Sequence, residues 1–486
     1  MQNPLREALG VGRFCYVVEL VASRLHREAR ILAVASGLAS VPGVVGGSVT
    51  SYAGGAPGRD PIRVAAAAKA RGLTPNVHVT CVSQHRQALR KTLEDLHALG
   101  IENVFAMTGD YPAAPPGQDR RAAEFDLDSV QLVALAAELR QAGMPFHIAV
   151  AVSPFKYAEA DCAYQYLKLE KKIAAGADLA ITQVGFDAGK FRELKRYLDE
   201  RGLRTSLLGN VYVLTQRAAE RMARGLPPGC WVAPELLEQV RREAGAKDGG
   251  RAARLERAAR LVAVLRGLGY AGAYLGGTDH AERIAWIIRR AEELAARWEE
   301  LADEFRYAPG DGFYLYEGGG RRARARRGAV PAALDALGRF LPVRRETRLR
   351  RALRAVLRWV AARPRLAWGL ERAEMAIKGP VFGCQACGNC VLGDLEYVCP
   401  QTCPKQMRNG PCGGTHLGRC EVEDKPCIWT AVYERAKAAG RLETLKVYVP
   451  PPHRQLQGTS SWINYFLELD SRPRAGTPPA PKGNPP

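Results

Sequence analysis

The sequence lacks any apolar run of the roughly 18 residues that a membrane-spanning helix needs. Its first stretch, MQNPLREALGVGRF, also lacks the apolar segment of a secretory signal, so we expect a cytoplasmic protein. No G-x-G-x-x-G follows the first predicted strand, which argues against a dinucleotide-binding Rossmann domain. What is present is 486 residues with 47 % hydrophobic content. This length is too great for one ordinary core, so two domains are expected.

Acidic residues are also scarce, with 50 Asp and Glu against 70 Lys and Arg, for a net charge of +20. Much of the excess lies between Arg321 and Arg365. Such a block can bind nucleic acid, an acidic membrane face or an acidic protein, or it can form a solvated linker and helix face. No helix-turn-helix, RNP or zinc-finger spacing accompanies the charge. Nucleic acid is therefore not an expected partner, and the lack of an apolar run of membrane-spanning length argues against a membrane.

Cysteine is concentrated in one stretch, which holds eight of the twelve cysteines in the chain. The eight are Cys384, Cys387, Cys390, Cys399, Cys403, Cys412, Cys420 and Cys427. The first three form C-x-x-C-x-x-C, and a Cys-Pro follows later, as in loops that bind a [4Fe-4S] cluster. Eight thiolates could hold two clusters, one cluster plus zinc, or structural zinc alone. A disulfide framework is not expected, because nothing marks the chain as secreted.

Between Phe14 and about Phe305, short β-branched runs alternate with amphipathic helical segments, and Gly turns often separate a helix from the next strand. The predicted strands are Phe14–Leu20, Val44–Ser51, Asn76–Thr80, Asn103–Met107, His147–Val152, Leu179–Gln183, Ser206–Val211 and Ala271–Leu275. Eight such repeats over roughly 300 residues predict an α/β fold, a (β/α)8 TIM barrel, more than an open sheet.

A TIM barrel carries its chemistry on the loops that follow its strands. The side chains at those positions are Glu19, Thr50, His78, Thr80, Thr108, Asp110, Ser153, Gln183, Asn210, Tyr212, Asp279 and His280. Glu19 lies within the apolar run YVVELV, where burial would raise its pKa and suit it to proton donation. It could equally be a buried Glu paired with Arg, as His78 could be a core histidine and Asp110 a loop cap. Lys168, Lys171 and Lys172 lie on a helix that could meet a phosphate or face solvent.

Several phrases resemble the catalytic barrel of methylenetetrahydrofolate reductases, in order and spacing from about Gly10 to about Glu300. They are YVVEL, GGSVT, NVHVTC, NVFAMTGDYP and KKIAAGADLAITQ. The later phrases KGPVFGCQACGNCVLGDLEYVCP, RNGPCGG, CIW, YERAKAAG and SSWIN are similar to the small companion subunit of acetogen-type reductases. Here the two would be fused in one chain.

The resemblance implies a flavin enzyme that reduces 5,10-methylenetetrahydrofolate to 5-methyltetrahydrofolate. By position, Glu19 matches the acid that assists ring opening, and Asp110 matches a carboxylate near flavin and pterin. Gln183 matches the side chain that positions the folate. The flavin-binding positions would be Thr50, His78, Asp110, Ser153, Lys168 and Lys172. The implied cofactors are FAD or FMN and one or two [4Fe-4S] clusters, with zinc as the alternative metal.

The sequence departs from the family at three places. The first strand continues as ELVAS instead of an aromatic and proline pair, Ser153-Pro154 replaces a Tyr-Pro, and His280 replaces an Arg. These changes leave the electron donor open between NAD(P)H and a ferredoxin that would dock on the Cys-rich module. They also keep two rivals open: a reductase with a structural zinc tail, and a non-catalytic assembly subunit. A homo-oligomer is compatible with the resemblance.

The predicted domain organisation follows from these segments. Residues 1–310 form the reductase-like barrel, 311–330 a Gly/Arg-rich flexible linker, 331–470 a helical and Cys-rich module, and 471–486 a disordered tail. Two helices, Pro331–Phe340 and Arg348–Ala362, are predicted ahead of the cysteines.

Overall fold

A computed structural model describes residues 3–22, 28–50, 52–53, 56–57, 60–112, 123–340 and 346–470. The chain divides into two compact units. Unit 1 comprises Met1–Ala323 together with Gly410–Cys427, and unit 2 comprises Arg324–Asn409 together with Ile428–Pro486. The predicted tail at 471–486 lies outside the described residues.

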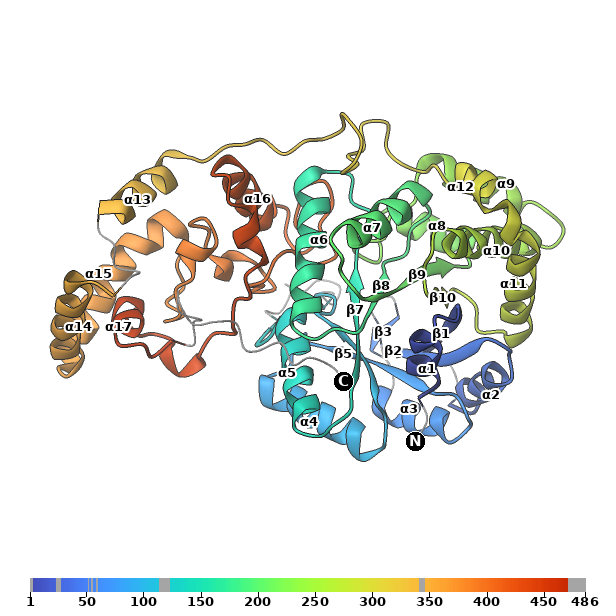
Figure 1. The fold of residues 1–486 in the computed structure, drawn as a ribbon, viewed down its shortest axis with the longest axis horizontal. Helices are drawn as coiled ribbons and strands as arrows, with labels where there is room; N and C mark the ends of the chain where they lie inside the picture. Colours follow the sequence, from blue (N-terminus) through green and yellow to red (C-terminus); the bar gives the residue numbers. More distant parts are fainter. Residues whose placement is uncertain are drawn as a thin grey trace. The chain divides into compact units, whose positions relative to one another are not determined.

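Unit 1 contains a closed parallel barrel of eight strands, in the order β1-β10-β9-β8-β7-β6-β5-β2, with helices around it (Figure 1). Its strands are β1 Cys15–Val21, β2 Val44–Thr50, β5 Pro75–Thr80, β6 Asn103–Met107, β7 His147–Val152, β8 Leu179–Thr182, β9 Ser206–Tyr212 and β10 Gly272–Gly276. A short antiparallel pair, β3 Tyr52–Ala53 and β4 Ala56–Pro57, follows β2. The predicted (β/α)8 fold is confirmed, and each predicted strand overlaps an observed one.

The helices of unit 1 follow the strands in alternation, as expected for this fold. They are α1 Pro4–Gly10, α2 Glu28–Ala39, α3 Pro61–Lys69, α4 Arg86–Ala98, α5 Ser129–Gln141, α6 Glu159–Ala174, α7 Ala188–Glu200, α8 Gln216–Ala223, α9 Pro234–Ala244, α10 Arg251–Gly267, α11 Ala281–Leu294 and α12 Trp298–Glu304. Local signals set their ends: Asp128 and Gln131 form a capping box at the start of α5.

The barrel interior is filled from the end where the strands begin. Leu5 and Ala8 of α1 pack with Val17, Phe105 and Leu208, which point inward from three strands. At the same end, a Cβ added to Gly272 would lie 2.2 Å from the Cys15 carbonyl oxygen, so only glycine allows β1 and β10 to pair there. This packing leaves the opposite end, where the strands finish, for a binding site.

Unit 2 consists of helices and irregular loops. Its elements are α13 Ala329–Phe340, α14 Arg348–Ala361, α15 Pro364–Phe382, η2 Leu392–Asp394, η3 Pro400–Thr402, α16 Ile428–Ala438, η4 Leu442–Lys446, η5 Arg454–Leu456 and α17 Ser461–Phe466. Trp429, Val432 and Tyr433 of α16 are buried in its core. The predicted helices match α13 and α14, whereas α15 was not predicted.

The unit boundaries differ from the predicted domains in two respects. Unit 1 extends to Ala323, within the predicted flexible linker. There the Glu159 amide donates to the Arg321 carbonyl at 2.9 Å, and the Ala323 amide donates to the Glu159 carboxylate at 2.9 Å. The first part of the linker is therefore held against α6. In addition, Gly410–Cys427, predicted as part of the C-terminal module, belongs with the barrel.

Among the helices of the described ranges, none has both the length and the apolar character that crossing a membrane requires.

Candidate functional site

The carboxyl ends of the strands carry Glu19, the predicted acid, on β1. The Glu19 carboxylate lies close to Gly276, because a Cβ built there would be 3.1 Å from Glu19 Oε2. Burial raises the pKa of the Glu19 carboxyl above its usual range, and a hydrogen bond from the Gly277 backbone opposes this only in part. The direction agrees with the prediction from YVVELV, and burial favours the protonated form of Glu19.

His78 of β5 contacts other residues of the barrel and is not a group that titrates near neutral pH. Its Nε2 lies 2.8 Å from the Ser48 hydroxyl, and its ring packs edge-on against Phe105 with centroids 4.8 Å apart. Burial lowers the pKa of His78 to about 3. His78 is thus neutral at physiological pH and presents an uncharged imidazole.

Several buried polar atoms near the carboxyl ends of the strands have no hydrogen-bond partner among the described residues. They are Ser153 Oγ after β7, Asn210 Oδ1 on β9 and Thr278 Oγ1 after β10. Buried polar groups are nearly always satisfied, so these atoms are available to a molecule bound at this end, although Tyr16, Asn76 and His147 near the starts of strands also have unpartnered polar atoms. Ser153 was predicted to contact a cofactor, and its position fits that role.

The remaining predicted rim residues have simpler surroundings. Thr50 ends β2 and is buried, with its carbonyl accepting a hydrogen bond from the Ala22 amide at 2.8 Å. The side-chain oxygen of Gln183, directly after β8, accepts from the Val184 amide at 2.9 Å. Asp110 is exposed on the loop after β6. Their predicted roles in binding folate and flavin stay predictions.

The three lysines of α6 are buried, but they differ in what they contact. Burial lowers the pKa values of Lys171 and Lys172 to about 7 each, with Asp128 opposing the shift. Lys172 donates to the Ala151 carbonyl at 2.6 Å. Lys168, in contrast, donates to the carbonyls of Gly410 and Pro411, at 3.3 and 2.9 Å. In this chain Lys168 therefore binds protein backbone at the position where a flavin contact was expected.

Lys168 belongs to a set of barrel side chains that bind the backbone of the segment Gly410–Thr415. Gln165 donates to the Cys412 carbonyl at 2.9 Å, and Lys156 donates to the Gly413 carbonyl at 2.7 Å and the Thr415 carbonyl at 2.5 Å. We call Lys156, Gln165 and Lys168 the carbonyl clamp.

The segment is also fixed at a further point, because the Gly418 amide donates to Asp161 at 2.8 Å. Clamp and segment both belong to unit 1. The segment Gly410–Cys427, which carries three of the eight late cysteines, is therefore part of the barrel unit, and it lies over α6.

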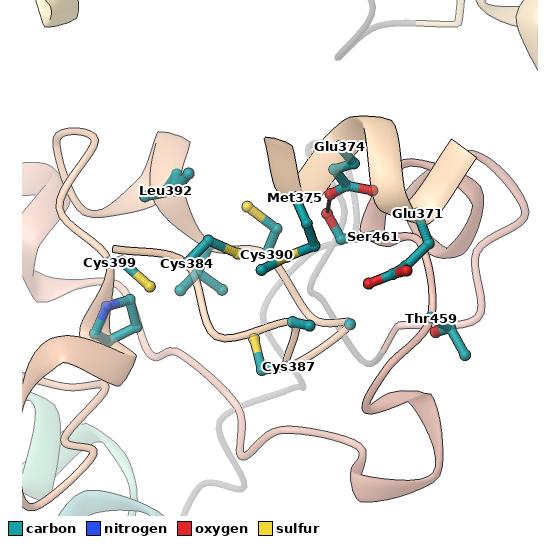
Figure 2. A pocket seen from close by; sticks show the side chains of 14 residues that line it. Glu371, Glu374, Met375, Cys384, Cys387, Cys390, Leu392, Cys399, Thr459 and Ser461 are labelled. Carbon is teal, nitrogen blue, oxygen red and sulfur yellow. Dashed lines mark hydrogen bonds between the residues drawn. The ribbon is translucent and has the colours of Figure 1, made fainter. Parts of the chain in front are cut away.

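Unit 2 contains a second candidate site, a hollow lined by four cysteines. Cys384, Cys387 and Cys390 come from the loop after α15, and Cys399 precedes η3. Figure 2 shows their thiols around one space, with Glu371, Glu374 and Met375 of α15 beside them. Burial raises the pKa of Cys399 to about 12, so it is a protonated thiol unless a cation is bound.

All twelve cysteines are free in this structure. Over the described ranges, however, no three or more Cys, His, Asp or Glu side chains are placed to hold a metal ion. Cys403 lies in unit 2 outside the hollow's lining, and Cys412, Cys420 and Cys427 lie in unit 1. The metal role predicted for the eight cysteines stays a prediction.

The sequence did not single out Lys156, Gln165 or Asp161. Each is buried and contacts backbone about 250 positions away, so no local periodicity identifies it. The signal that could have found Lys156 is its place on the loop that follows β7, the loop that also carries Ser153.

Comparison with known families gives two matches. The pattern described as "Methylenetetrahydrofolate reductase" matches residues 5–259, and "Methylene-tetrahydrofolate reductase C terminal" matches residues 367–455. Among individual proteins, the chain is 35 % identical over 121 residues to the 5,10-methylenetetrahydrofolate reductase of Pectobacterium carotovorum, covering 25 % of this chain and 37 % of the relative. It is 33 % identical over 121 residues to that of Escherichia coli, again covering 25 % and 37 %.

A third relative, methylenetetrahydrofolate reductase 2 of Schizosaccharomyces pombe, is 24 % identical over 248 residues, covering 47 % of this chain and 37 % of the relative. The matches thus span little more than a third of these relatives. Among solved structures, an uncharacterized Clostridium thermocellum protein described as binding two copies of 5-methyl-5,6,7,8-tetrahydrofolic acid aligns at a TM-score of 0.43. Its identity is 12 %, and the alignment covers 60 % of this chain and 99 % of that one.

Proposed function

The chain belongs to the methylenetetrahydrofolate reductase family, and from this premise we propose that it reduces 5,10-methylenetetrahydrofolate to 5-methyltetrahydrofolate. The observation that carries the proposal is Glu19, a carboxyl with raised pKa at the end of the barrel where binding sites lie. The unpartnered polar atoms of Ser153, Asn210 and Thr278 support a ligand at the same end.

Glu19 supplies the proton that this reaction needs. The substrate's methylene carbon is bonded to two nitrogens, and one of these bonds must break before the carbon can be reduced. Protonation of that nitrogen makes it a leaving group, so a neutral carboxylic acid is required beside it. Burial holds Glu19 in that neutral form at a pH where an exposed carboxyl would be ionised.

The residues at this end fit a flavin. Lys171 and Lys172 are buried cations on α6 that suit a phosphate group, and neutral His78 and the Ser153 hydroxyl suit the polar edge of a ring. When bound, a flavin supplies the hydride that adds to the methylene carbon. Whether the flavin is FAD or FMN is left to its identification in purified protein.

The four cysteines that line the hollow of unit 2 have the residue chemistry of an iron–sulfur site, although their side chains are not placed to hold a metal ion as they stand. Cys384, Cys387 and Cys390 have the spacing that such clusters use, Cys399 completes four ligands, and a proline follows Cys399. When bound, a cluster supplies one-electron transfer, so the Cys-rich unit would receive electrons from a ferredoxin-like donor for the barrel. Zinc, with NAD(P)H as the donor, is the competing assignment for the same four thiols.

The test is Glu19→Gln, with Glu282→Gln on the exposed surface of α11 as the matched control. In Glu19→Gln, flavin stays bound and reducible, while turnover of methylenetetrahydrofolate falls by roughly two to four decades, the scale expected for a lost general acid. The control keeps wild-type turnover. Unchanged turnover in Glu19→Gln removes Glu19 from the reaction, and a colourless purified protein removes the flavin and with it the proposed reaction.

A further inference from the structure

Exposed apolar side chains are concentrated on three helices of unit 2. Fifteen large hydrophobic side chains are exposed among the described residues, and ten of these lie between Val330 and Val381. The most prominent are Trp359 and Trp368, with 54 % and 63 % of their surface exposed. Aromatic side chains of this size are rarely left in water without a partner, so the concentration marks an interaction surface.

On α14 and α15 these side chains follow helical spacing. Leu349, Val356 and Trp359 lie on one side of α14, separated by seven and three residues. On α15, Ile377 and Val381 are four residues apart on one side, whereas Trp368, nine residues before Ile377, lies on the opposite side. α14 packs against α15 and α17, yet Arg350 is its sole fully buried residue. Two neighbouring helices thus present apolar side chains that nothing in the described part of the chain covers.

Arginines are concentrated on the same two helices. Between Arg348 and Arg372 the chain has eight arginines and one carboxylate, Glu371. Six of these arginines are exposed and form no ion pair with any described residue: Arg348, Arg351, Arg358, Arg363, Arg365 and Arg372. Two of them stack on the tryptophans, Arg363 at 3.9 Å from Trp359 and Arg372 at 5.0 Å from Trp368. Such a surface favours a partner with a negatively charged face.

The same helix that carries part of this surface also lines the four-thiol hollow. Glu371, Glu374 and Met375 of α15 face the hollow (Figure 2). Ile377 and Val381 do not line the hollow, and both are exposed. A helix is about 10–12 Å across. A partner seated on α15 would therefore lie roughly one helix diameter from the four thiols.

We propose that the exposed face of α14 and α15 is the docking surface for an acidic one-electron carrier protein. The proposal rests on the function proposed above, because it places the electron donor beside the four-thiol hollow. Reduction of the methylene group consumes two electrons and two protons, so a one-electron carrier must dock twice per turnover. Repeated docking requires a weak, quickly released complex, and electron-transfer complexes bury under about 1,200 Å². Exposed apolar side chains with exposed arginines on the same two helices meet that requirement.

The test measures binding of the full chain to an oxidised, acidic bacterial ferredoxin at low and moderate salt. The variant Arg351→Glu/Arg358→Glu/Arg365→Glu reverses three exposed charges of the surface. The matched control, Arg217→Glu/Arg251→Glu/Arg289→Glu, makes the same change in net charge on exposed arginines of the barrel unit. We expect the surface variant to raise Kd at least thirtyfold and the control less than threefold. Trp359→Ala, which changes no charge, should raise Kd about tenfold.

Other outcomes overturn the proposal. An equal loss in both triple variants means that binding is only non-specific charge attraction. In a second outcome, the wild-type chain sediments with phosphatidylglycerol vesicles and the surface variant does not, while both bind ferredoxin equally. That result assigns the surface to a membrane. A wild-type dimer that Trp359→Ala converts to monomer assigns it to a second copy. Binding of oxidised ferredoxin needs no turnover, and turnover with a reduced viologen needs no docking, so failure of this proposal is separable from failure of the proposed reaction.

Discussion

The eight late cysteines, which form one run in the sequence, belong to two different bodies in the structure. Four of them, in unit 2, line one hollow from a loop that follows α15. Three others, Cys412, Cys420 and Cys427, lie in a segment of unit 1 whose backbone is held by the carbonyl clamp. The first group lines the hollow of unit 2, whereas the second group belongs to a segment that binds barrel side chains through its backbone. Cysteine spacing therefore identifies candidate ligands but does not say which fold presents them.

The largest expected effect is loss of metal, which tests whether the two groups of cysteines differ in binding it. Cys384→Ser/Cys399→Ser removes two of the four thiols around the hollow, and we expect iron, or zinc, bound to purified protein to fall by at least one full site. Cys420→Ser is the matched control, and we expect metal content per chain to stay within about a fifth of wild type. Anaerobic purification followed by metal analysis makes the measurement. Equal losses in the two variants would show that both groups of cysteines serve metal, contrary to the distinction drawn here.

The next effect separates two lysines of one helix. Lys168→Met leaves the Gly410 and Pro411 carbonyls without their buried donor, which costs about 1–3 kcal/mol. Amide hydrogen exchange in Gly410–Cys427 should accelerate tenfold or more, with flavin affinity within threefold of wild type. Lys172→Met should do the reverse, weakening flavin binding at least tenfold without faster exchange in the segment. If Lys168→Met loses flavin while amide exchange in Gly410–Cys427 stays slow, Lys168 contacts the cofactor and does not hold the segment.

A smaller effect tests how closely the segment fits the barrel. Gly410 has a φ of +119°, and a Cβ there would lie 2.9 Å from the Tyr164 ring. Gly410→Ala should therefore destabilise docking of the segment by about 1–3 kcal/mol. Gly413 has neither constraint, since nothing lies within 4 Å of an added Cβ. Gly413→Ala should change the protection of the segment by less than about 0.5 kcal/mol. Equal protection of the segment in both variants would show that it is not docked as described.

The barrel could be predicted from the sequence because its signals are local. β-branched runs and Gly turns located every strand to within a few residues, and the apolar neighbours of Glu19 predicted its raised pKa. The carbonyl clamp could not be predicted, because Lys156 and Thr415 are brought together only by the tertiary fold. α15 was missed because Pro364 and Pro380 indicate helix breaks, yet Pro364 lies at its first turn and Pro380 is tolerated near its end.

The smallest effect concerns pH and again sets Lys168 apart from its neighbours. Burial lowers the pKa values of Lys171 and Lys172 to about 7, so in the free protein both are charged below that pH and lose charge above it. A flavin phosphate that needs one of these lysines charged should therefore bind with a Kd that rises by about fifteenfold between pH 7 and pH 8.5. Fluorescence titration of the flavin-free protein measures this slope.

Lys168→Met removes a charge that helps to lower the pKa values of Lys171 and Lys172, so the rise in Kd should move to higher pH, whereas Lys172→Met should flatten it. A wild-type Kd that does not change over this range would mean that the two lysines do not bind the phosphate. In that case Lys171 and Lys172 would not differ from Lys168 in binding a ligand, and the phosphate would bind other residues of the barrel.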